Sequence, residues 1–219
     1  MKTTYNLNKE KLISLYIDFV LEKQSEPSSV YAFAKANQFE ETEFYKYFGT
    51  LKALEDTILT YFFEHTLTLL HQSEDFNGYD DKHKLLSLYY TFFEQLTMNR
   101  SFMKIFLNQE NQMFQNVKKL KPLKTQYLKF INQLDIAKSK ISNERIDNLR
   151  IKSVGESFWV LFLSVFKFWY DDTSANLEKT DLYIEKSVHA SFDLVDTKPV
   201  QSIIDFGKFI LKEQLNIKV

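Results

Sequence analysis

Residue types that commonly catalyse reactions or bind metals form no recognisable site by their spacing in this 219-residue sequence. The four histidines are His65, His71, His83 and His189, and no two of them have the i, i+4 spacing of a zinc-binding helix. Cysteine is absent, which excludes a thiolate metal site, a disulfide and a cysteine nucleophile. No glycine-rich phosphate loop or nucleophile elbow is present. We therefore expect a protein that is not an enzyme and that needs no cofactor and no metal.

Carboxylates are concentrated instead in the stretch "NQFEETEFYKYFGTLKALEDTI", residues 37–58. Glu40, Glu41 and Glu43 stand at the start of a short helix predicted over residues 41–48. Glutamate near a helix N-terminus is favourable through the helix dipole, but a phosphate would dock at the same end. Two interpretations stay open: a solvated, self-capped helix that binds nothing, or a DNA-reading helix in which glutamate accepts from cytosine.

The charge balance of the first 56 residues bears on this choice. They contain seven lysines, nine acids and no arginine, a net charge of −2. DNA affinity comes largely from lysine and arginine neutralising phosphates, so the balance predicts that DNA binding is weakened or lost. If DNA is bound, the contact candidates are Thr42, Tyr45, Lys46 and Lys52.

The segment "VYAFAKANQFEETEFYKYFGTLKALEDTIL", residues 30–59, resembles the TetR family of one-component bacterial regulators. That family's aromatic signature and the Lys and Leu that follow it correspond here to Tyr45, Tyr47, Phe48, Lys52 and Leu54. The resemblance implies a three-helix helix-turn-helix head over residues 1–50. The family usually has a small residue and Gly in the turn, where Asn37 and Gln38 stand. Because Asn tolerates left-handed backbone, we expect the turn to form without Gly.

Composition and periodicity predict an all-α fold. Hydrophobic residues make up 44% of the chain, and only 4 Gly and 3 Pro are available for sharp turns. Helical periodicity gives ten segments, over residues 8–23, 29–36, 41–48, 51–72, 82–98, 100–120, 122–134, 144–170, 177–194 and 199–215. We expect residues 51–219 to form a larger helical domain for ligand binding and dimerisation. Residues 144–170 and 177–194 would supply the four-helix bundle of a homodimer.

The segment from Phe168 to Leu215 is similar to the C-terminal region of the coenzyme Q biosynthesis lipid-binding protein family. The similarity rests on an acidic-Ser segment, Asp171, Asp172 and Ser174, that leads into Glu178 and Thr180. It implies a TetR fold that does not act as an ordinary repressor and that contacts lipid and membranes through an extra C-terminal helix.

The predicted last helix is amphipathic, with an apolar face that includes Ile203, Phe206 and Ile210. Such a helix can lie at a membrane interface, cover a partner protein or pack on its own body. A run of lysines, Lys118, Lys119, Lys121, Lys124 and Lys129, forms either a solvated face or a site for anionic lipid heads or an acidic partner.

Aromatic residues of the later helices offer an apolar chamber. The ligand-pocket candidates are Phe93, Phe106, Glu156, Trp159, Phe162 and Phe166. Ligand sites are mostly apolar with a few polar groups, which suits Glu156 as a polar handle; core packing alone is the alternative explanation.

The net charge of −1 favours neither nucleic acid nor an anionic membrane. We expect a cytoplasmic protein, since the N-terminus lacks an apolar run of signal-peptide length. The first reading is a homodimeric TetR-fold protein that binds an apolar or lipid-like ligand and has weakened or lost DNA binding. The alternatives are a ligand-responsive regulator that binds operator DNA as a homodimer, and a protein-binding adaptor.

Overall fold

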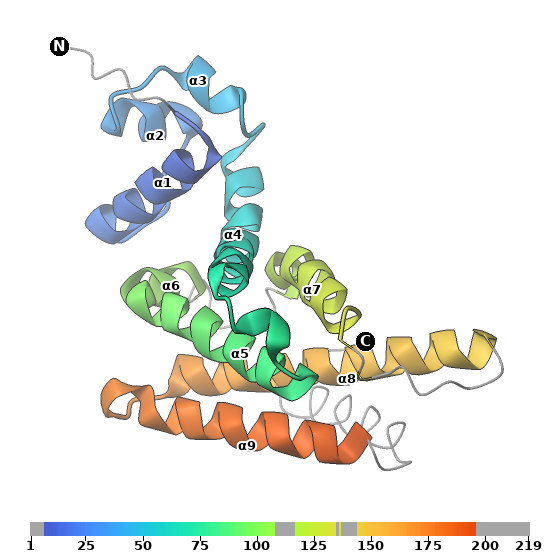
Figure 1. Ribbon diagram of the computed structural model, residues 1–219. Helices are drawn as coiled ribbons and strands as arrows, with labels where there is room; N and C mark the ends of the chain where they lie inside the picture. Colours follow the sequence, from blue (N-terminus) through green and yellow to red (C-terminus); the bar gives the residue numbers. More distant parts are fainter. Residues whose placement is uncertain (1–6, 108–116, 135, 137–143, 196–219) are drawn as a thin grey trace. The chain divides into compact units, whose positions relative to one another are not determined.

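The computed structural model describes residues 7–107, 117–134, 136 and 144–195. Within these ranges the chain forms nine α-helices and two short 3-10 helices, and contains no strand (Figure 1). The elements are α1 (Lys9–Lys23), α2 (Val30–Ala36), α3 (Glu41–Tyr45), α4 (Leu51–Gln72), η1 (Phe76–Gly78), α5 (Asp81–Met98), α6 (Arg100–Leu107), α7 (Val117–Ile131), α8 (Glu144–Asp171), η3 (Ala175–Leu177) and α9 (Glu178–Val195). The predicted all-α fold is confirmed. None of the helices in these ranges combines the length and apolar character needed to cross a bilayer.

Packing divides the chain into two compact units whose boundaries cut through helices. Residues Met1–Phe62 and Leu96–Pro122 form the first, here called the head unit. Residues Phe63–Gln95 and Leu123–Val219 form the second, the body unit. The predicted boundary at residue 50 was a division by function, and it stays a prediction. By packing, the first half of α4 belongs with the head, and so does α6, which packs against α1.

Polar side chains cap three helices of the head unit, α1, α2 and α4. Asn8, Ser29 and Thr50 each accept a hydrogen bond from the backbone N–H three residues further on, at 2.7, 3.1 and 3.0 Å. Such caps satisfy donors that have no partner within the helix. Phe33 fills the centre of the head. Its ring centroid lies 5.5–6.2 Å from those of four other aromatic rings, Tyr16, Phe19, Phe39 and Phe44.

The turn between α2 and α3 uses left-handed backbone at Gln38. Gln38 has φ of 58°, whereas Asn37 has φ of −99°. The turn thus forms without Gly, but the left-handed residue is Gln38 and not Asn37. Asn37 continues the last turn of α2 instead, and its side-chain Nδ2 donates to the Phe33 carbonyl at 2.9 Å.

Backbone hydrogen bonds show why the left-handed position falls one residue later. The Phe39 N–H donates to the Ala34 carbonyl at 3.1 Å, and the Gln38 N–H donates to the Lys35 carbonyl at 3.4 Å. This pair of bonds, with the Phe39 ring packed against Phe33, is the Schellman arrangement at a helix C-terminus. Its left-handed residue is usually Gly, and here a glutamine adopts it.

Helix α3 is short and lacks a side-chain cap. It covers Glu41–Tyr45 rather than residues 41–48, because the Tyr47 and Phe48 N–H groups both donate to the Phe44 carbonyl and close a tighter turn. Glu40 occupies the N-cap position, but its side chain makes no capping hydrogen bond with the helix. The interpretation of a self-capped helix is therefore wrong.

Helix α7 runs through Pro122 instead of beginning there. It begins at Val117, five residues earlier than Pro122. The proline removes one backbone donor from the helix, but the buried apolar face continues across it through Leu120, Leu123 and Tyr127. Burial of that face outweighs the lost hydrogen bond, so the predicted break at Pro122 is wrong.

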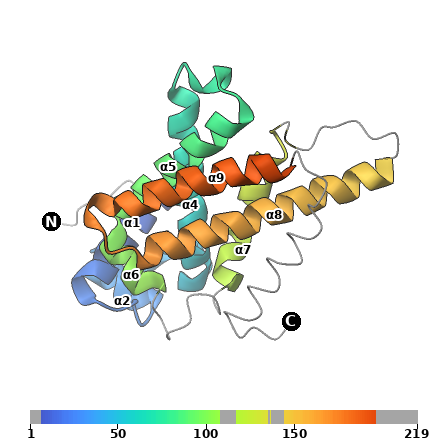
Figure 2. The same ribbon diagram turned by 90° about the horizontal axis from the view of Figure 1, so that it is seen from below.

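In the body unit, α8 and α9 run side by side as an antiparallel hairpin (Figure 2). The ring of Phe168 on α8 stacks on Tyr183 of α9, with centroids 4.4 Å apart. Ile184 and Val188 of α9 are fully buried.

The turn that joins α8 to α9 is organised by the buried carboxylate of Asp172. It accepts from the Ser174 N–H at 2.8 Å, the Thr180 N–H at 2.9 Å and the Thr180 hydroxyl at 2.7 Å. Loss of solvent raises the pKa of Asp172, but the hydrogen bonds from Thr180 and Ser174 outweigh this and lower it to about 2. Three of the residues behind the C-terminal resemblance, Asp172, Ser174 and Thr180, thus have a structural role at the N-terminus of α9.

Candidate functional site

Two places in the molecule hold the residues singled out in the sequence, one in each unit. The first is the face of the head formed by α3 and the start of α4. Thr42 is exposed, and so is about half of Tyr45. Tyr45 donates its hydroxyl to Glu41 at 2.9 Å, and Lys46 donates to Glu43 at 2.6 Å. Two of the four DNA-contact candidates are therefore bonded to carboxylates of their own helical turn.

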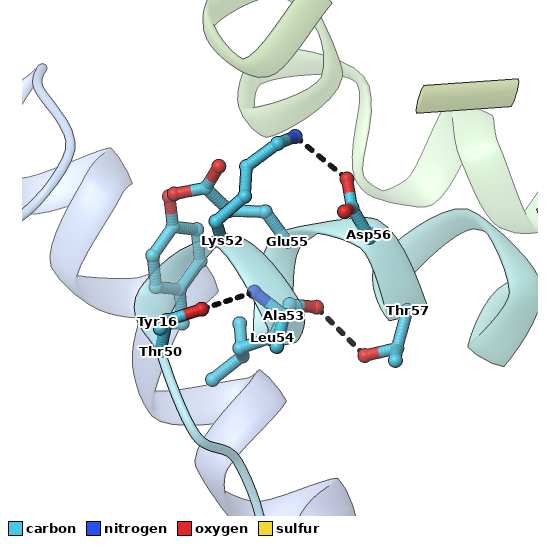
Figure 3. Close-up of polar contacts among 8 residues, drawn as sticks. All are labelled: Tyr16, Thr50, Lys52, Ala53, Leu54, Glu55, Asp56 and Thr57. Atoms are coloured by element: carbon cyan, nitrogen blue, oxygen red, sulfur yellow. Dashed lines mark hydrogen bonds and ion pairs between the residues drawn. The ribbon is translucent and has the colours of Figure 1, made fainter. Parts of the chain in front are cut away.

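The start of α4 repeats this pattern (Figure 3). Lys52 reaches Asp56 at 2.6 Å, and Thr50 caps the helix at the Ala53 N–H. On the buried side of the same turn, Tyr16 of α1 donates to Glu55 at 3.0 Å. Burial and the Glu55 carboxylate raise the pKa of Tyr16 well above its usual range, so that the phenol stays a donor and ties α1 to α4.

A phosphate approaching this face would meet donors that already have acceptors. Tyr45, Lys46 and Lys52 are each engaged with a carboxylate three or four residues away in the chain. These are exposed pairs and therefore weak, yet each carboxylate also adds a negative charge that repels phosphate.

The second place is a group of buried rings in the body unit, called the aromatic cluster below. Its rings come from α4, α5, α7 and α8, and it comprises Phe63, Tyr89, Phe92, Phe93, Tyr127, Trp159, Phe162, Phe166 and Trp169. Phe162 lies at its centre, with centroid distances of 4.8 Å to Tyr127 and 5.3 Å to Trp159. The ring contacts fall in the range in which edge and offset arrangements are favourable.

Four of the six ligand-pocket candidates meet in this cluster: Phe93, Trp159, Phe162 and Phe166. Phe106 does not, because it belongs to the head unit, where it stacks on Phe102 with centroids 5.2 Å apart. Glu156 points to an ion pair rather than to the rings: Lys124 of α7 donates to it at 2.7 Å, and both side chains are about one-third exposed. Lys124 is therefore paired with a carboxylate, and it no longer counts as a free positive charge of the lysine run.

Five residues of the cluster were not among the candidates, and two of these, Tyr89 and Tyr127, carry a hydroxyl. Tyr89 and Tyr127 are fully buried, and their hydroxyl oxygens lie 2.6 Å apart. The Tyr127 hydroxyl also donates to the Phe158 carbonyl at 3.0 Å. Tyr127 falls inside the lysine run, where the high density of charge obscures the apolar spacing. Its spacing of four and seven residues from Leu123 and Leu120 was the available signal for a buried face.

The remaining candidates lie outside the described residues. These are Ile203, Phe206 and Ile210 of the predicted last helix, and the side chains of Lys118 and Lys119 also lie outside them. Within the described ranges no group of three or more His, Cys, Asp or Glu is arranged to hold a metal ion.

Comparison with protein families decides the kind of protein to which this geometry belongs. The family model described as "Tetracyclin repressor-like, C-terminal domain" matches residues 84–210, more than half of the chain. This chain belongs to the TetR family. The matched range begins within α5 and includes all of the aromatic cluster except Phe63. No curated protein and no solved structure matches the chain.

The family match confirms the TetR resemblance from a part of the chain other than the one that carries its helix-turn-helix signature. The sequence suggested TetR through residues 30–59, whereas the match covers residues 84–210. The helix-turn-helix assignment of the TetR head follows from family membership and from the α1–α3 arrangement. A TetR-family domain is typical of regulators that are not enzymes.

Proposed function

We propose that this TetR-family protein binds an apolar or lipid-like ligand within its body unit, and that its head has weakened or lost DNA binding. The observation that carries the proposal is the aromatic cluster, which offers buried rings from four helices and one polar pair. Mostly apolar surroundings with few polar groups are typical of small-molecule sites. The cluster lies almost wholly in the range that matches the family's C-terminal domain.

The proposal for the head rests on charge. Its contact candidates Tyr45, Lys46 and Lys52 are bonded to carboxylates, and its first 56 residues carry a net charge of −2 without arginine. A phosphate would have to displace a carboxylate at each of these donors. Because neutralisation of phosphates supplies most of non-specific DNA affinity, the head is poorly suited to that task.

Two further parts of the proposal concern partners. The α8–α9 hairpin would pair with its copy in a second chain as a four-helix bundle, giving a homodimer. The lipid-like character of the ligand, and a membrane or partner contact by the helix predicted over residues 199–215, come from the similarity to the coenzyme Q biosynthesis lipid-binding family. The lipid-like ligand and the contact by the last helix rest on that similarity alone. Asp172 and Thr180, two of the residues shared with that family, are explained structurally by the cap of α9.

Native mass spectrometry of the gently purified full chain tests the ligand. We expect a dimer mass with an additional apolar small molecule that organic solvent extracts and that chromatography with mass detection can identify. A dimer without any added mass, from cells grown under several conditions, would contradict ligand binding. Liposome flotation of the full chain and of a version ending at residue 198 tests membrane contact by the last helix.

A second candidate function is a ligand-responsive repressor, and membership of the TetR family favours it. In that case the head would read an operator as a dimer, and the ligand would change the spacing of the two heads. Fluorescence anisotropy with the DNA upstream of the protein's own gene separates the two functions. Tight, salt-sensitive and sequence-selective binding would establish the repressor and contradict the loss of DNA binding.

A further inference from the structure

The aromatic cluster contains two hydroxyls that packing alone does not require. Tyr89 and Tyr127 are fully buried, and phenylalanine at either position would fill nearly the same space without a polar atom. Moving a hydroxyl out of water has a free-energy cost that one internal hydrogen bond offsets only in part. A role other than filling space would explain this polar pair.

The direction of the hydrogen bonds follows from the chemistry of the partners. The Phe158 carbonyl can only accept, so the Tyr127 hydroxyl donates its single proton to it. The proton between the two tyrosines then comes from Tyr89. The oxygen of Tyr89 ends the chain of bonds with its acceptor capacity unused, and in the described part of the protein no group donates to it.

Charge at this position is excluded by burial. Burial raises the pKa of Tyr89, and burial together with the neighbouring Tyr89 raises the pKa of Tyr127 well above its ordinary value. Both hydroxyls therefore stay protonated at ordinary pH. The described ion pair between α7 and α8, Lys124 with Glu156, is internally neutral and partly exposed. A carboxylate ligand would meet an acceptor at Tyr89 and no compensating cation.

Resting on the proposed function, we infer that the ligand is an uncharged, mostly apolar molecule that donates a hydrogen bond to the Tyr89 oxygen, as a phenol or an alcohol does. Its hydrocarbon part lies against the rings that border Tyr89, Phe93 at 6.2 Å and Phe162 at 5.6 Å between centroids. Tyr89 determines specificity. Tyr127 is a positioning residue, which holds the Tyr89 hydroxyl through its own bond to α8.

A matched pair of probes tests this without any mutation. 4-Butylphenol and 4-butylanisole share the ring, the alkyl chain and the oxygen, but only the phenol donates a hydrogen bond. By isothermal titration calorimetry on the full chain we expect the phenol to bind about fivefold more tightly, the effect of one neutral hydrogen bond. Apolar burial alone favours the ether, so it predicts the opposite order. 4-Butylbenzoate should bind more weakly than either.

The variant Tyr89→Phe should remove the preference, giving nearly equal affinities for phenol and ether. Tyr90→Phe is the matched control, since Tyr90 is the next residue of α5 and is 36% exposed; it should keep the preference. Three outcomes overturn the inference: an ether that binds the natural chain as tightly as the phenol, a preference that survives in Tyr89→Phe, or no binding of either probe. The proposed function survives each of them if native mass spectrometry finds a ligand, and fails separately if it finds none.

Discussion

The α3–α4 face of the head unit and the aromatic cluster of the body unit treat their polar groups in opposite ways. In the head, lysines and an exposed tyrosine are bonded to acids one helical turn away, as in Lys46 with Glu43 and Lys52 with Asp56. In the body, the hydroxyls of Tyr89 and Tyr127 are buried among rings and bonded across 38 residues of chain. The donors of the head face are thus already engaged with carboxylates, in line with the proposed weakening of DNA binding. The aromatic cluster is apolar apart from one hydroxyl pair, which is the arrangement on which the proposed ligand site rests.

The largest expected effect comes from removing the ring at the centre of the aromatic cluster. Phe162→Ala should lower the free energy of unfolding by about 4 kcal/mol, because it deletes a fully buried ring and leaves a cavity. Tyr31→Ala, on the head surface and 60% exposed, should change it by less than about 0.5 kcal/mol. Urea unfolding followed by circular dichroism measures both. Equal costs would remove the contrast between a packed interior and a solvated face.

The next effect concerns the cap of α9. Asp172→Ala should cost about 2 kcal/mol, because the Thr180 and Ser174 donors lose a charged acceptor. The folded-state pKa of about 2 lies below the ordinary value of 3.8, so the contribution of Asp172 is fully present above pH 4. It is lost as the pH falls from 4 toward 2.

Stability curves against pH check this assignment. Across that window the natural chain should lose more stability than Asp172→Ala does. Asp171→Ala is the control, since Asp171 is exposed and pairs with Lys167 on the surface of α8. A pH dependence of Asp172→Ala identical to that of the natural chain would rule out Asp172 as its source.

The paired acids of the head make the third prediction. The triple variant Glu41→Gln, Glu43→Gln, Asp56→Asn changes the charge of the first 56 residues from −2 to +1 and frees Tyr45, Lys46 and Lys52. Non-specific DNA affinity should rise about tenfold at low salt, with a steeper salt dependence, because phosphate contacts release counterions. Fluorescence anisotropy of a labelled duplex measures the change.

The control for that variant alters the same charge elsewhere in the head. Glu10→Gln, Asp18→Asn and Glu22→Gln remove three acids of α1. If these raise DNA affinity as much as the first set does, net charge rather than pairing at the contact face limits binding.

The smallest expected effect is local to the turn after α2. Gln38→Gly should raise the free energy of unfolding by about 1 kcal/mol, since glycine adopts the left-handed backbone at φ of 58° without steric cost. Gln38→Val should lower it, because a β-branched residue is strained there. Thermal unfolding distinguishes the two, and a loss of stability in Gln38→Gly would mean that the glutamine side chain contributes a contact of its own.

Features that depend on neighbours in the chain were predictable from the sequence. The caps at Asn8 and Ser29, the start of α4 after Thr50 and the bounds of α8 follow from local rules for donors and apolar spacing. The TetR resemblance also came from local spacing of aromatic residues. Local rules misjudged Pro122, which lies inside α7 because the buried face of that helix continues across it.

The candidate site was harder to predict, because its contacts join distant parts of the chain. Phe93 and Phe162 were identifiable as apolar residues on amphipathic helices, but nothing in the sequence separates them from Phe106, which packs in the head unit. Likewise, Glu156 gained a partner in Lys124 from a different helix. The hydroxyl pair of Tyr89 and Tyr127 follows only from the packing of α5 against α7 and α8.

The contact between α6 and α1 has a practical consequence for anyone who wishes to study the ligand-binding region alone. Cutting the chain at residue 50 would delete α1 and leave α6 without its covering. The apolar side chains of α6 are buried in the intact chain, each at most 3% exposed, and would lose the cover that α1 provides: Phe102, Met103, Phe106 and Leu107. A fragment beginning at residue 51 should therefore self-associate, and exchanging heads between relatives has to carry α6 along with the first three helices.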